Sequence, residues 1–298
     1  MQRKESHTTM VRIALIQGSP RNSNNCPDQD SKTLLLAKKI IASAPSDITI
    51  DLIDLSIKGD GNIVQPCKGC TSTSSFHCHY SCDCYVAGSE KFPDFMHNEK
   101  IYDRLKVADG ILVLTPVHWY SVTSAVKSFF DRLVCINLTL TTELAEQLAI
   151  GKDATKSRMV EKAGEFNHLL KNHYAGKYAA FLAHGDNGGV DYREFSDDIN
   201  WHSSMPPSLR KFMLGESEGQ VNHPRNAVMP LAWQCRYSGI NVPDDLIVGF
   251  HATSGVGYAE AMDLAETNLE SYYNVGINLF QRLIEYLRTS YPANPPGA

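Results

Sequence analysis

The segment IQGSPRNSNNCPDQDSKTLLLAKKI (residues 16–40) decides the fold class. It begins inside an apolar run, VRIALIQ at 11–17, which stops at Gly18. A polar stretch follows, and a helical pattern begins near Ser31, with Ser31 or Asp30 as its cap. The segment therefore predicts a buried strand, a loop rich in hydroxyl, amide and guanidinium groups, and the start of a helix. Such a loop either binds an anion at the helix N-terminus or is a plain surface loop with a serine cap.

The same alternation of strand and helix continues along the chain. Further apolar runs predict strands at 47–55, at 110–116 with its end at Pro116, at 177–185 and at 245–252. Helical patterns predict helices at 31–44, 94–108, 124–135, 227–239 and 259–290. Strands that are apolar throughout are typical of a parallel sheet with helices on both faces. The sequence therefore predicts an α/β fold with a doubly wound, five-stranded parallel sheet.

Composition limits the class of protein. The 298 residues carry 28 basic and 33 acidic side chains, and the net charge of −5 gives no basic footprint for nucleic acid. No apolar run approaches the roughly 20 residues of a membrane span, and the N-terminus lacks the apolar core of a signal peptide. We therefore expect a cytoplasmic protein that binds neither nucleic acid nor membrane.

The expected organisation is one domain at 11–290 between flexible tails at 1–10 and 291–298. Within it, the segments that fit no regular pattern are a Cys-rich loop at 56–93 and two insertions, at 137–176 and 190–228. A structureless segment of this length inside a compact domain usually has a function.

Three loops follow strands of the predicted sheet, and ligands of doubly wound sheets bind at the carboxyl ends of the strands. The first loop offers hydroxyl and guanidinium donors for a phosphate. The second, TPVHWYSVTSAVK, offers aromatic groups for a flat ring, unless Trp119 and Tyr120 are core or interface residues. The third, AHGDNGG at 183–189, permits a close backbone approach to a ligand, or is a simple tight turn. Together the loops predict one pocket for a phosphate and a planar ring.

The residues of these loops resemble a known family. GSPR with the later SKT, and TPVHWYSVTSAVKSFFDRL at 115–133, resemble the flavodoxin-like NAD(P)H-dependent FMN reductases. In that family a GSxR-type loop grips the FMN phosphate and an (S/T)PxYWxSxxxxxKxFxDR segment holds the isoalloxazine. His118 stands where the family often has Tyr or Phe, and the phosphate loop carries about six extra residues around NCPDQD.

The resemblance implies a strand order of 2-1-3-4-5, bound FMN, NAD(P)H as co-substrate and a homodimer or homotetramer. It implies transfer of electrons through the flavin to a small acceptor of the quinone, nitro or flavin type, with His118 and Tyr120 as candidate proton donors. The cofactor-binding residues that it implies are Ser19, Arg21, Ser23, Ser31, Thr33, Pro116, Val117, His118, Trp119, Tyr120, Gly185, Asp186, Asn187 and Gly188.

Five of the eight cysteines fall within the segment CKGCTSTSSFHCHYSCDC at 67–84. In a reducing compartment such a group suggests metal or redox chemistry more than structural disulfides. The segment resembles the compact cysteine motif of iron–sulfur flavoproteins, whose usual spacing, C-x2-C-x2-C before a fourth cysteine, is tighter. A 4Fe–4S cluster, a structural zinc ion and metal-free thiols or a redox disulfide all stay open. The candidate metal ligands are Cys67, Cys70, Cys78, Cys82 and Cys84.

Two other functions follow from this segment. An iron–sulfur flavoprotein would carry electrons to a protein partner rather than reduce a small molecule. A zinc-stabilised binding protein on the same scaffold would have no enzymatic activity. Lys127, Asp131 and Arg132 lie on one predicted helix, and we expect them to serve that helix face or an interface.

Overall fold

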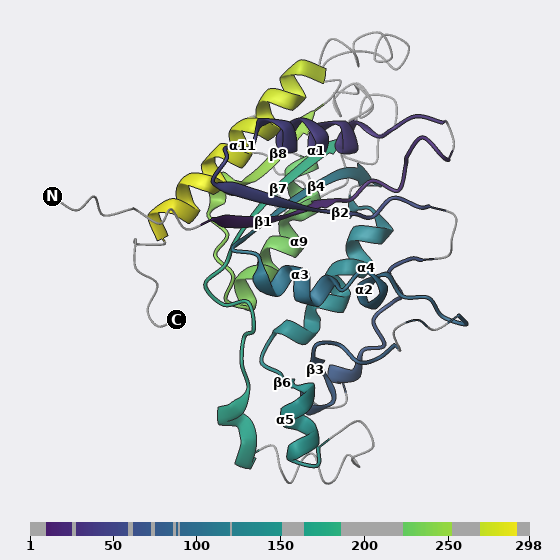
Figure 1. Cartoon of the computed structure of the whole chain (residues 1–298), viewed down its shortest axis with the longest axis vertical. Helices are drawn as coiled ribbons and strands as arrows, with labels where there is room; N and C mark the ends of the chain where they lie inside the picture. The colour runs from purple at the N-terminus through teal and green to yellow at the C-terminus, as the bar shows by residue number, and fades with distance from the viewer. Residues whose placement is uncertain are drawn as a thin grey trace, which may run out of the picture.

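The protein is described by a computed structural model (Figure 1). The structure describes residues 10–25, 28–58, 62–72, 75–85, 88, 90–119, 121–150, 164–185, 223–251 and 269–290. The expected tails, residue 10 apart, most of the insertion at 190–228 and part of the predicted last helix therefore lie outside the described residues.

A parallel sheet forms the centre of the molecule. Its strands are β1 (Val11–Gln17), β2 (Ile48–Asp54), β4 (Gly110–His118), β7 (Tyr178–Gly185) and β8 (Ile247–His251). They lie in the order β2-β1-β4-β7-β8, and each neighbouring pair is parallel. Counted over these five strands, the order is 2-1-3-4-5. A short sixth strand, β5 (Ser121–Val122), pairs antiparallel with the end of β4.

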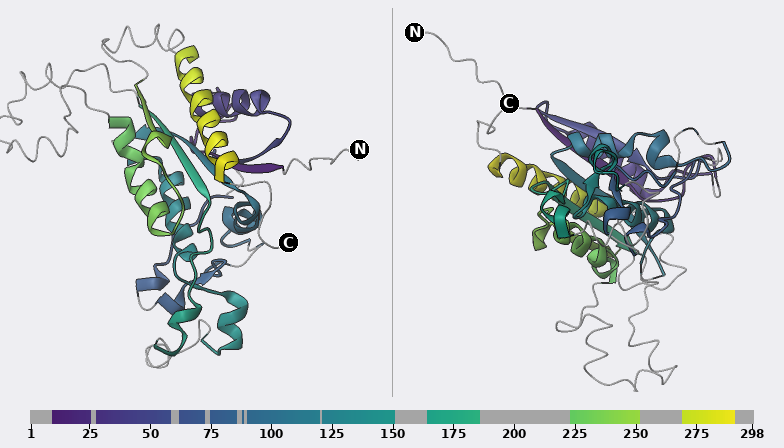
Figure 2. Two further views of the ribbon diagram at one scale, coloured as in Figure 1. Left: turned by 90° about the vertical axis from the view of Figure 1, so that its left-hand side faces the viewer. Right: turned by 90° about the horizontal axis from the view of Figure 1, so that it is seen from below.

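Helices cover both faces of the sheet, as Figure 2 shows edge-on. On one face lie α1 (Lys32–Ser43) and α11 (Leu269–Ser290). On the other lie α3 (Ile101–Val107), α4 (Ser124–Arg132) and α9 (His223–Tyr237).

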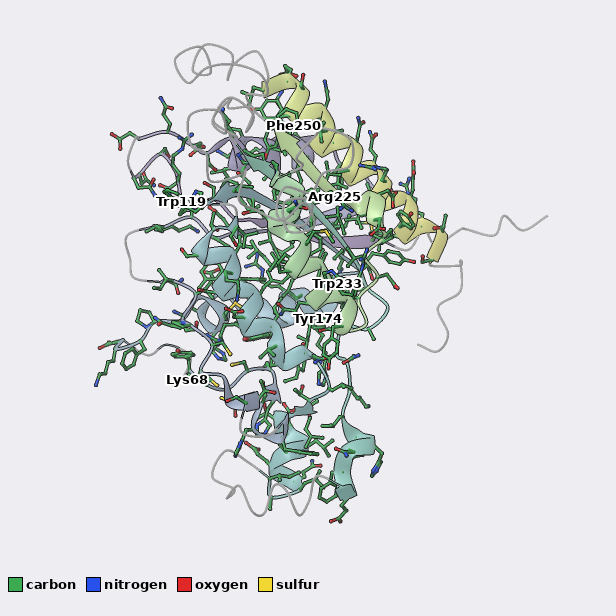
Figure 3. The ribbon with its side chains drawn as sticks, turned by 180° about the vertical axis from the view of Figure 1, so that it is seen from behind. Lys68, Trp119, Tyr174, Arg225, Trp233 and Phe250 are labelled. Carbon is green, nitrogen blue, oxygen red and sulfur yellow. The ribbon has the colours of Figure 1, made fainter. Side chains whose placement is uncertain are left out.

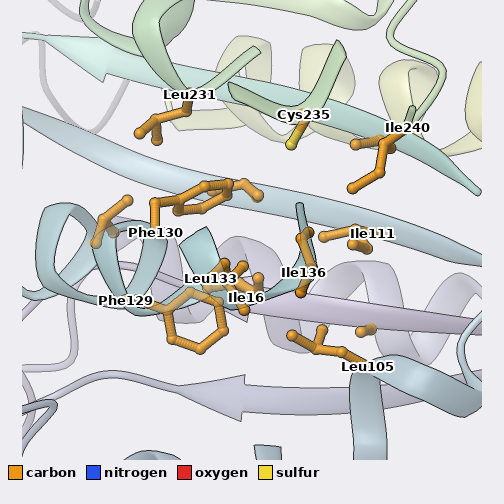
Figure 4. Packing of buried hydrophobic residues seen from close by; sticks show 14 of the residues in the cluster. Ile16, Leu105, Ile111, Phe129, Phe130, Leu133, Ile136, Leu231, Cys235 and Ile240 are labelled. Carbon is orange, nitrogen blue, oxygen red and sulfur yellow. The ribbon is translucent and has the colours of Figure 1, made fainter. Parts of the chain in front are cut away.

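Strand β1 explains why the sequence reads as a continuous apolar run. Ile13 and Leu15 pack toward α1 and α11, whereas Ala14 and Ile16 pack toward the opposite helices. Successive side chains of a strand alternate between faces, so a strand buried on both faces is apolar throughout. Figure 4 shows the apolar core between the sheet and the helices α3, α4 and α9, where Phe129 of α4 lies among residues from the sheet.

The predicted end of the third strand at Pro116 is wrong. Strand β4 continues through Pro116 to His118. Pro116 is the last residue of β4 in the parallel ladder with β7, and Val117 and His118 then pair with β5 in a hairpin. A proline that ends a ladder removes one donor without ending the extended backbone, because the next pairing begins with the following residue.

Three predicted helices also differ from the structure. The helix at 94–108 is divided into α2 (Phe95–Asn98) and α3, with Lys100 at φ 51° between them. The helix at 124–135 ends at Arg132 and continues as a 3-10 turn, η3 (Leu133–Ile136). Residues 223–228, expected to close an insertion, belong instead to α9, which contains Pro230.

The Cys-rich loop and the insertion at 137–176 pack against each other below the sheet (Figure 1). Strand β3 (His79–Tyr80) of the first pairs with β6 (Leu140–Thr141) of the second. Short helical elements complete this region: η1 (Cys70–Ser72), η2 (Ser75–His77), α5 (Thr142–Gln147) and η4 (Asn167–Leu169). Phe76, Leu140, Ala145 and Ile150 form its own small core.

One further 3-10 turn, η6 (Asp244–Leu246), leads into β8. None of the helices in the described part of the chain combines the length and the apolar character needed to span a bilayer.

Candidate functional site

The loop between β1 and α1 lies against the end of β4. The Gly18 N–H donates to the Leu114 carbonyl at 2.8 Å, and the Thr123 hydroxyl donates to the Gly18 carbonyl at 2.7 Å. Thr123 also caps α4 by accepting from Val126 N. A Cβ atom on Gly18 would clash with Val126 Cγ2 and lie 3.1 Å from the Leu114 carbonyl oxygen. The residue without a side chain therefore lets the loop pack directly on α4.

Buried hydroxyl groups gather at the start of α1. Ser31 is the N-cap, and its Oγ accepts from Leu34 N at 3.1 Å. Ser19 Oγ accepts from Arg21 N at 3.3 Å. Each of these hydroxyls still has its own proton to donate. Thr33 is fully buried, and its Oγ1 makes no hydrogen bond of normal geometry within the described residues.

These hydroxyls test whether the loop fits the phosphate that its sequence implies. The first backbone N–H groups of a helix have no partner within the helix and carry a partial positive charge. A buried hydroxyl without a partner in the first turn adds a donor for the same ligand. The donor set is therefore that of an anion site, and the loop fits a phosphate group.

His184, at the end of β7, adds a group that sequence reasoning missed. Its Nδ1 lies 3.1 Å from the hydroxyl of Tyr272 on α11. Burial, together with the positive charges of Lys32 and Arg21, lowers the pKa of His184 to about 3. His184 is therefore neutral at physiological pH. The sequence signal that could have identified His184 is its position, as a polar residue beside glycines at the carboxyl end of a predicted strand.

The charges that act on His184 come from separate elements of the fold. Lys32 begins α1, Arg21 belongs to the first loop and His118 ends β4. The topology thus gathers two permanent positive charges at the same end of the sheet as Thr33. The Arg21 guanidinium also donates to the Asp30 carbonyl at 3.3 Å, which holds the loop closed on itself.

The second predicted loop is the β4–β5 hairpin. Pro116 and Val117 are half-buried, whereas His118 is exposed. Trp119 is 93% exposed, with φ 47°, and Figure 3 shows it at the edge of the molecule. Trp119 is therefore not a core residue. Tyr120 lies outside the described residues.

The third loop begins at Gly185, which is buried and pairs with His251 of β8. A Cβ on Gly185 would lie 3.4 Å from Val117, so the end of β7 and the hairpin touch. Asp186, Asn187 and Gly188 lie outside the described residues. Ser23 is exposed, and its backbone N–H donates to the Asp30 carboxylate. The structure therefore does not place Ser23 with the buried hydroxyls of Ser19, Ser31 and Thr33.

The predicted metal ligands do not form a metal site in the described part of the chain. No group of three or more Cys, His, Asp or Glu side chains there is arranged to hold a metal ion. Cys70 Sγ and Cys84 Sγ lie 3.0 Å apart. Two thiolates on one tetrahedral zinc ion lie about 3.8 Å apart, since each Zn–S bond is about 2.3 Å. The observed spacing therefore fits neither zinc nor a cluster in which each sulfur binds its own iron atom.

The remaining cysteines of the segment differ in environment. Cys78 and Cys82 are buried, and Cys67 is half-buried and accepts from Gly69 N. A hydrogen bond from Cys84, with the positive charge of Arg132, lowers the pKa of Cys82 to about 5. Burial, together with the neighbouring cysteines, raises the pKa of Cys78 to about 12.

Arg132 has a different place from the one expected on a helix face. Its guanidinium is fully buried and donates to both carboxylate oxygens of Asp94, at 2.9 and 3.0 Å. It also donates to the Gln65 carbonyl at 3.2 Å. Arg132 therefore fastens the Cys-rich segment to α4. Lys127 and Asp131 form the expected exposed pair one turn apart.

Comparison with known proteins adds the family. Residues 11–155 match the model of a family described as NADPH-dependent FMN reductase. An iron–sulfur flavoprotein from Methanosarcina thermophila is 24% identical over 209 residues, which span 67% of this chain and 93% of that protein. Residues 11–155 include the loop between β1 and α1, the β4–β5 hairpin and the five cysteines at 67–84.

Two solved structures are similar at a greater distance. RosB with a bound intermediate, 8-demethyl-8-formylriboflavin-5′-phosphate, is 13% identical with a TM-score of 0.45, over 95% of this chain and 82% of its own. The azoreductase AzrA is 12% identical with a TM-score of 0.44, over 90% of this chain and 100% of its own. Neither resemblance says which acceptor this chain uses. Residues 11–155, slightly under half of the chain, therefore resemble the NADPH-dependent FMN reductase family, and this match supports an NAD(P)H-dependent FMN oxidoreductase.

Proposed function

We propose that this chain holds the FMN phosphate in the loop between β1 and α1, through Ser19, Arg21, Ser31 and Thr33. The observation that carries the proposal is the buried Thr33 hydroxyl, which makes no normal hydrogen bond within the described residues. Leaving a buried polar group unpaired costs about 1–3 kcal/mol, and a phosphate oxygen that accepts the Thr33 proton removes this cost. Arg21 and Lys32 supply the charge that a dianionic phosphate needs.

The isoalloxazine ring would lie on the β4–β5 hairpin, against Pro116, Val117, His118, Trp119 and Tyr120. The contact between Val117 and Gly185 supports this, because it joins the hairpin to the end of β7 beside the phosphate loop. The exposed indole of Trp119 offers a flat apolar surface. That Gly185, Asp186, Asn187 and Gly188 close the other side of the pocket, and that Ser23 contributes, stay predictions.

FMN, when bound, takes a hydride from NAD(P)H and supplies two electrons to a second substrate. The residues of the chain bind and orient the cofactor and exclude water from its phosphate. The proposed acceptor is a small flat molecule of the quinone, nitro or flavin type. His118 is exposed on the hairpin and would hold a proton for such an acceptor, with Tyr120 as the other candidate.

The name of the Methanosarcina relative raises the alternative of an iron–sulfur electron carrier. The contact between Cys70 and Cys84 does not favour a cluster in this chain, and the same contact does not favour structural zinc.

The proposal is tested by FMN titration of the cofactor-free protein, followed by turnover. We expect one FMN per chain and oxidation of NADPH or NADH that depends on added quinone, nitro compound or free flavin. Binding of riboflavin, which lacks the phosphate, should be weaker by at least tenfold. Equal affinity for FMN and riboflavin would contradict the phosphate site, and FMN binding without turnover on any acceptor would contradict the reductase.

The predicted homodimer or homotetramer also belongs to the proposal. Trp233 and Tyr237 lie one turn apart on α9 and are 63% and 72% exposed, which supports a contact there. Figure 3 shows Trp233 on the outer side of that helix. Analytical ultracentrifugation of the full chain decides between monomer and oligomer.

A further inference from the structure

The thiols of Cys70 and Cys84 are paired in space but separated in sequence. Cys70 begins η1, and Cys84 follows β3. Their sulfur atoms lie 3.0 Å apart, and both residues are half-buried. We propose that Cys70 and Cys84 form a reversible disulfide by exchange with a low-molecular-weight disulfide such as oxidised glutathione. The inference is independent of FMN binding and goes beyond the reductase activity.

The spacing of the two sulfurs is what carries the inference. A disulfide needs the sulfurs at about 2.05 Å, so a small side-chain movement of roughly 1 Å joins them. Thiolates bound to one metal ion are held apart by the metal, at about 3.8 Å for zinc. The bridge would close a loop around Phe76, which is buried in the small core below the sheet and already holds this segment in place.

Basic side chains lie close to the backbone of the pair. Lys68 Nζ donates to the Cys84 carbonyl at 2.7 Å and lies 4.4 Å from the centre of the Tyr85 ring. The Arg132 guanidinium lies 4.7 Å from the centre of the same ring. Two cations therefore flank Tyr85, the residue next to Cys84. Figure 3 shows Lys68 on the outer side of this segment, where solutes have access.

The reaction balances in two steps. One protein thiolate attacks the small disulfide, forms a mixed disulfide and releases one small thiol. The second protein thiolate then attacks the protein sulfur of that mixed disulfide, forms the Cys70–Cys84 bond and releases the other small thiol. The small disulfide is reduced by two electrons, the protein pair is oxidised, and the two thiol protons leave with the two small thiols.

The site is mechanically connected to the flavin end of the sheet. Cys82 interacts with Arg132, the last residue of α4. Thr123 caps the other end of α4 and donates to Gly18 of the phosphate loop. The pair therefore lies near one end of α4, and the other end of α4 supports the loop between β1 and α1.

The experiment uses the full chain, loaded with FMN where it binds, and equilibrated in mixtures of reduced and oxidised glutathione. N-ethylmaleimide traps the remaining thiols, and mass spectrometry of the digest maps the cross-links. We expect a Cys70–Cys84 cross-link that forms with oxidised glutathione and is lost completely with excess reduced glutathione. Metal analysis of the same sample should show less than one iron or zinc per chain.

Variants sharpen the result. Cys67→Ser lies in the same segment and should retain the cross-link, whereas Cys70→Ser and Cys84→Ser should each lose it. The wild-type map decides the question if a variant fails to fold. Alkylation of both Cys70 and Cys84 at every glutathione ratio would overturn the inference. So would a cross-link between other cysteines, a glutathione adduct that never resolves, or stoichiometric iron or zinc that protects the thiols.

Discussion

The hydroxyl of Tyr272 lies 3.1 Å from Nδ1 of His184, and this contact joins the last helix to the end of β7. Burial raises the pKa of Tyr272 and lowers that of His184, so a neutral phenol and a neutral imidazole share this hydrogen bond. The Thr33 hydroxyl counteracts this rise, which places it beside the same phenol. Helix α11, far along the chain, thus supports the floor of the phosphate loop.

Tyr272→Phe should destabilise the protein by about 1–2 kcal/mol, because it leaves His184 Nδ1 without its hydrogen-bond partner. The measurement is urea denaturation followed by circular dichroism. Tyr273→Phe is the matched control, since it removes a hydroxyl from the adjacent residue without a hydrogen bond among the described contacts and should cost less than about 0.5 kcal/mol. Equal losses in both variants would show that the His184 contact contributes nothing.

The stability of the FMN-free protein should fall with pH below about 6.5 because of His184. Its pKa is about 3 in the folded chain and 6.5 when unperturbed. Between these values the unfolded chain binds one more proton at this residue, so folding stability decreases as the pH falls. His184→Gln removes that proton while its amide oxygen can still accept from Tyr272. The free energy of unfolding should therefore fall less steeply with decreasing pH between 6.5 and 4 in the variant. The difference in slope corresponds to the uptake of at most one proton on unfolding. Parallel curves would contradict the low pKa.

Thr33→Val should weaken FMN binding and stabilise the cofactor-free protein. The change keeps the shape of the side chain and removes the buried hydroxyl, which makes no hydrogen bond of normal geometry within the described residues. A hydrogen bond to a charged group contributes about 1.5–3 kcal/mol, so the FMN dissociation constant should rise roughly tenfold to a hundredfold. Thr49→Val, on the exposed side of β2, is the control and should change neither quantity. Unchanged FMN affinity in Thr33→Val would remove Thr33 from the phosphate site.

Gly18→Ala should destabilise the protein by about 1–3 kcal/mol, because the new methyl group overlaps Val126 on α4. Gly164→Ala is the control, since a Cβ there meets no atom within 4 Å. The double variant Gly18→Ala/Val126→Ala should lose less stability than the sum of the single variants, because the second change makes room for the first. If the stability losses of the two single variants simply add in the double variant, measured by thermal or chemical denaturation, the overlap with Val126 does not cause the loss in Gly18→Ala.

Asp94→Asn should cost about 3–5 kcal/mol, because it leaves the buried Arg132 guanidinium without its counter-charge. Asp131→Asn, on the same helix as Arg132, breaks the exposed pair with Lys127 and should cost less than about 1 kcal/mol. Limited proteolysis should also cleave the Cys-rich segment faster in Asp94→Asn, since Arg132 fastens it to α4. Similar stability losses in the two variants would contradict the burial of the Arg132–Asp94 pair.

The strands of the sheet could be predicted because the patterns that specify them lie within a few consecutive residues. The alternation along β1 and the capping serine before α1 each lie within a few residues, and the structure confirms both. The position of Arg132 could not be predicted, since its partner Asp94 lies 38 positions earlier and only the folded Cys-rich segment brings them together. The same holds for His184, whose partner Tyr272 is 88 positions away.

The candidate site divides in the same way. A hydroxyl-rich loop between an apolar strand and a helix cap is visible in the sequence, and the structure confirms Ser31 as that cap. Which hydroxyl is left without a partner depends on packing between α1 and α11, so Thr33 stands out only in the structure. The cysteine spacing alone leaves metal and thiol chemistry open, and the short distance between Cys70 Sγ and Cys84 Sγ, on which the proposed disulfide rests, is visible only in the structure.

The backbone of Trp119 has a consequence for protein engineering. A residue with a large side chain at φ 47° is strained by about 1 kcal/mol or more, and glycine would relieve that strain. Replacing an indole that is 93% exposed removes almost no packing. Trp119→Gly is therefore the kind of substitution that a screen for heat resistance would select and that a screen for flavin turnover would reject. With the flavin pocket proposed above, the tip of this hairpin would provide a binding surface at the expense of stability.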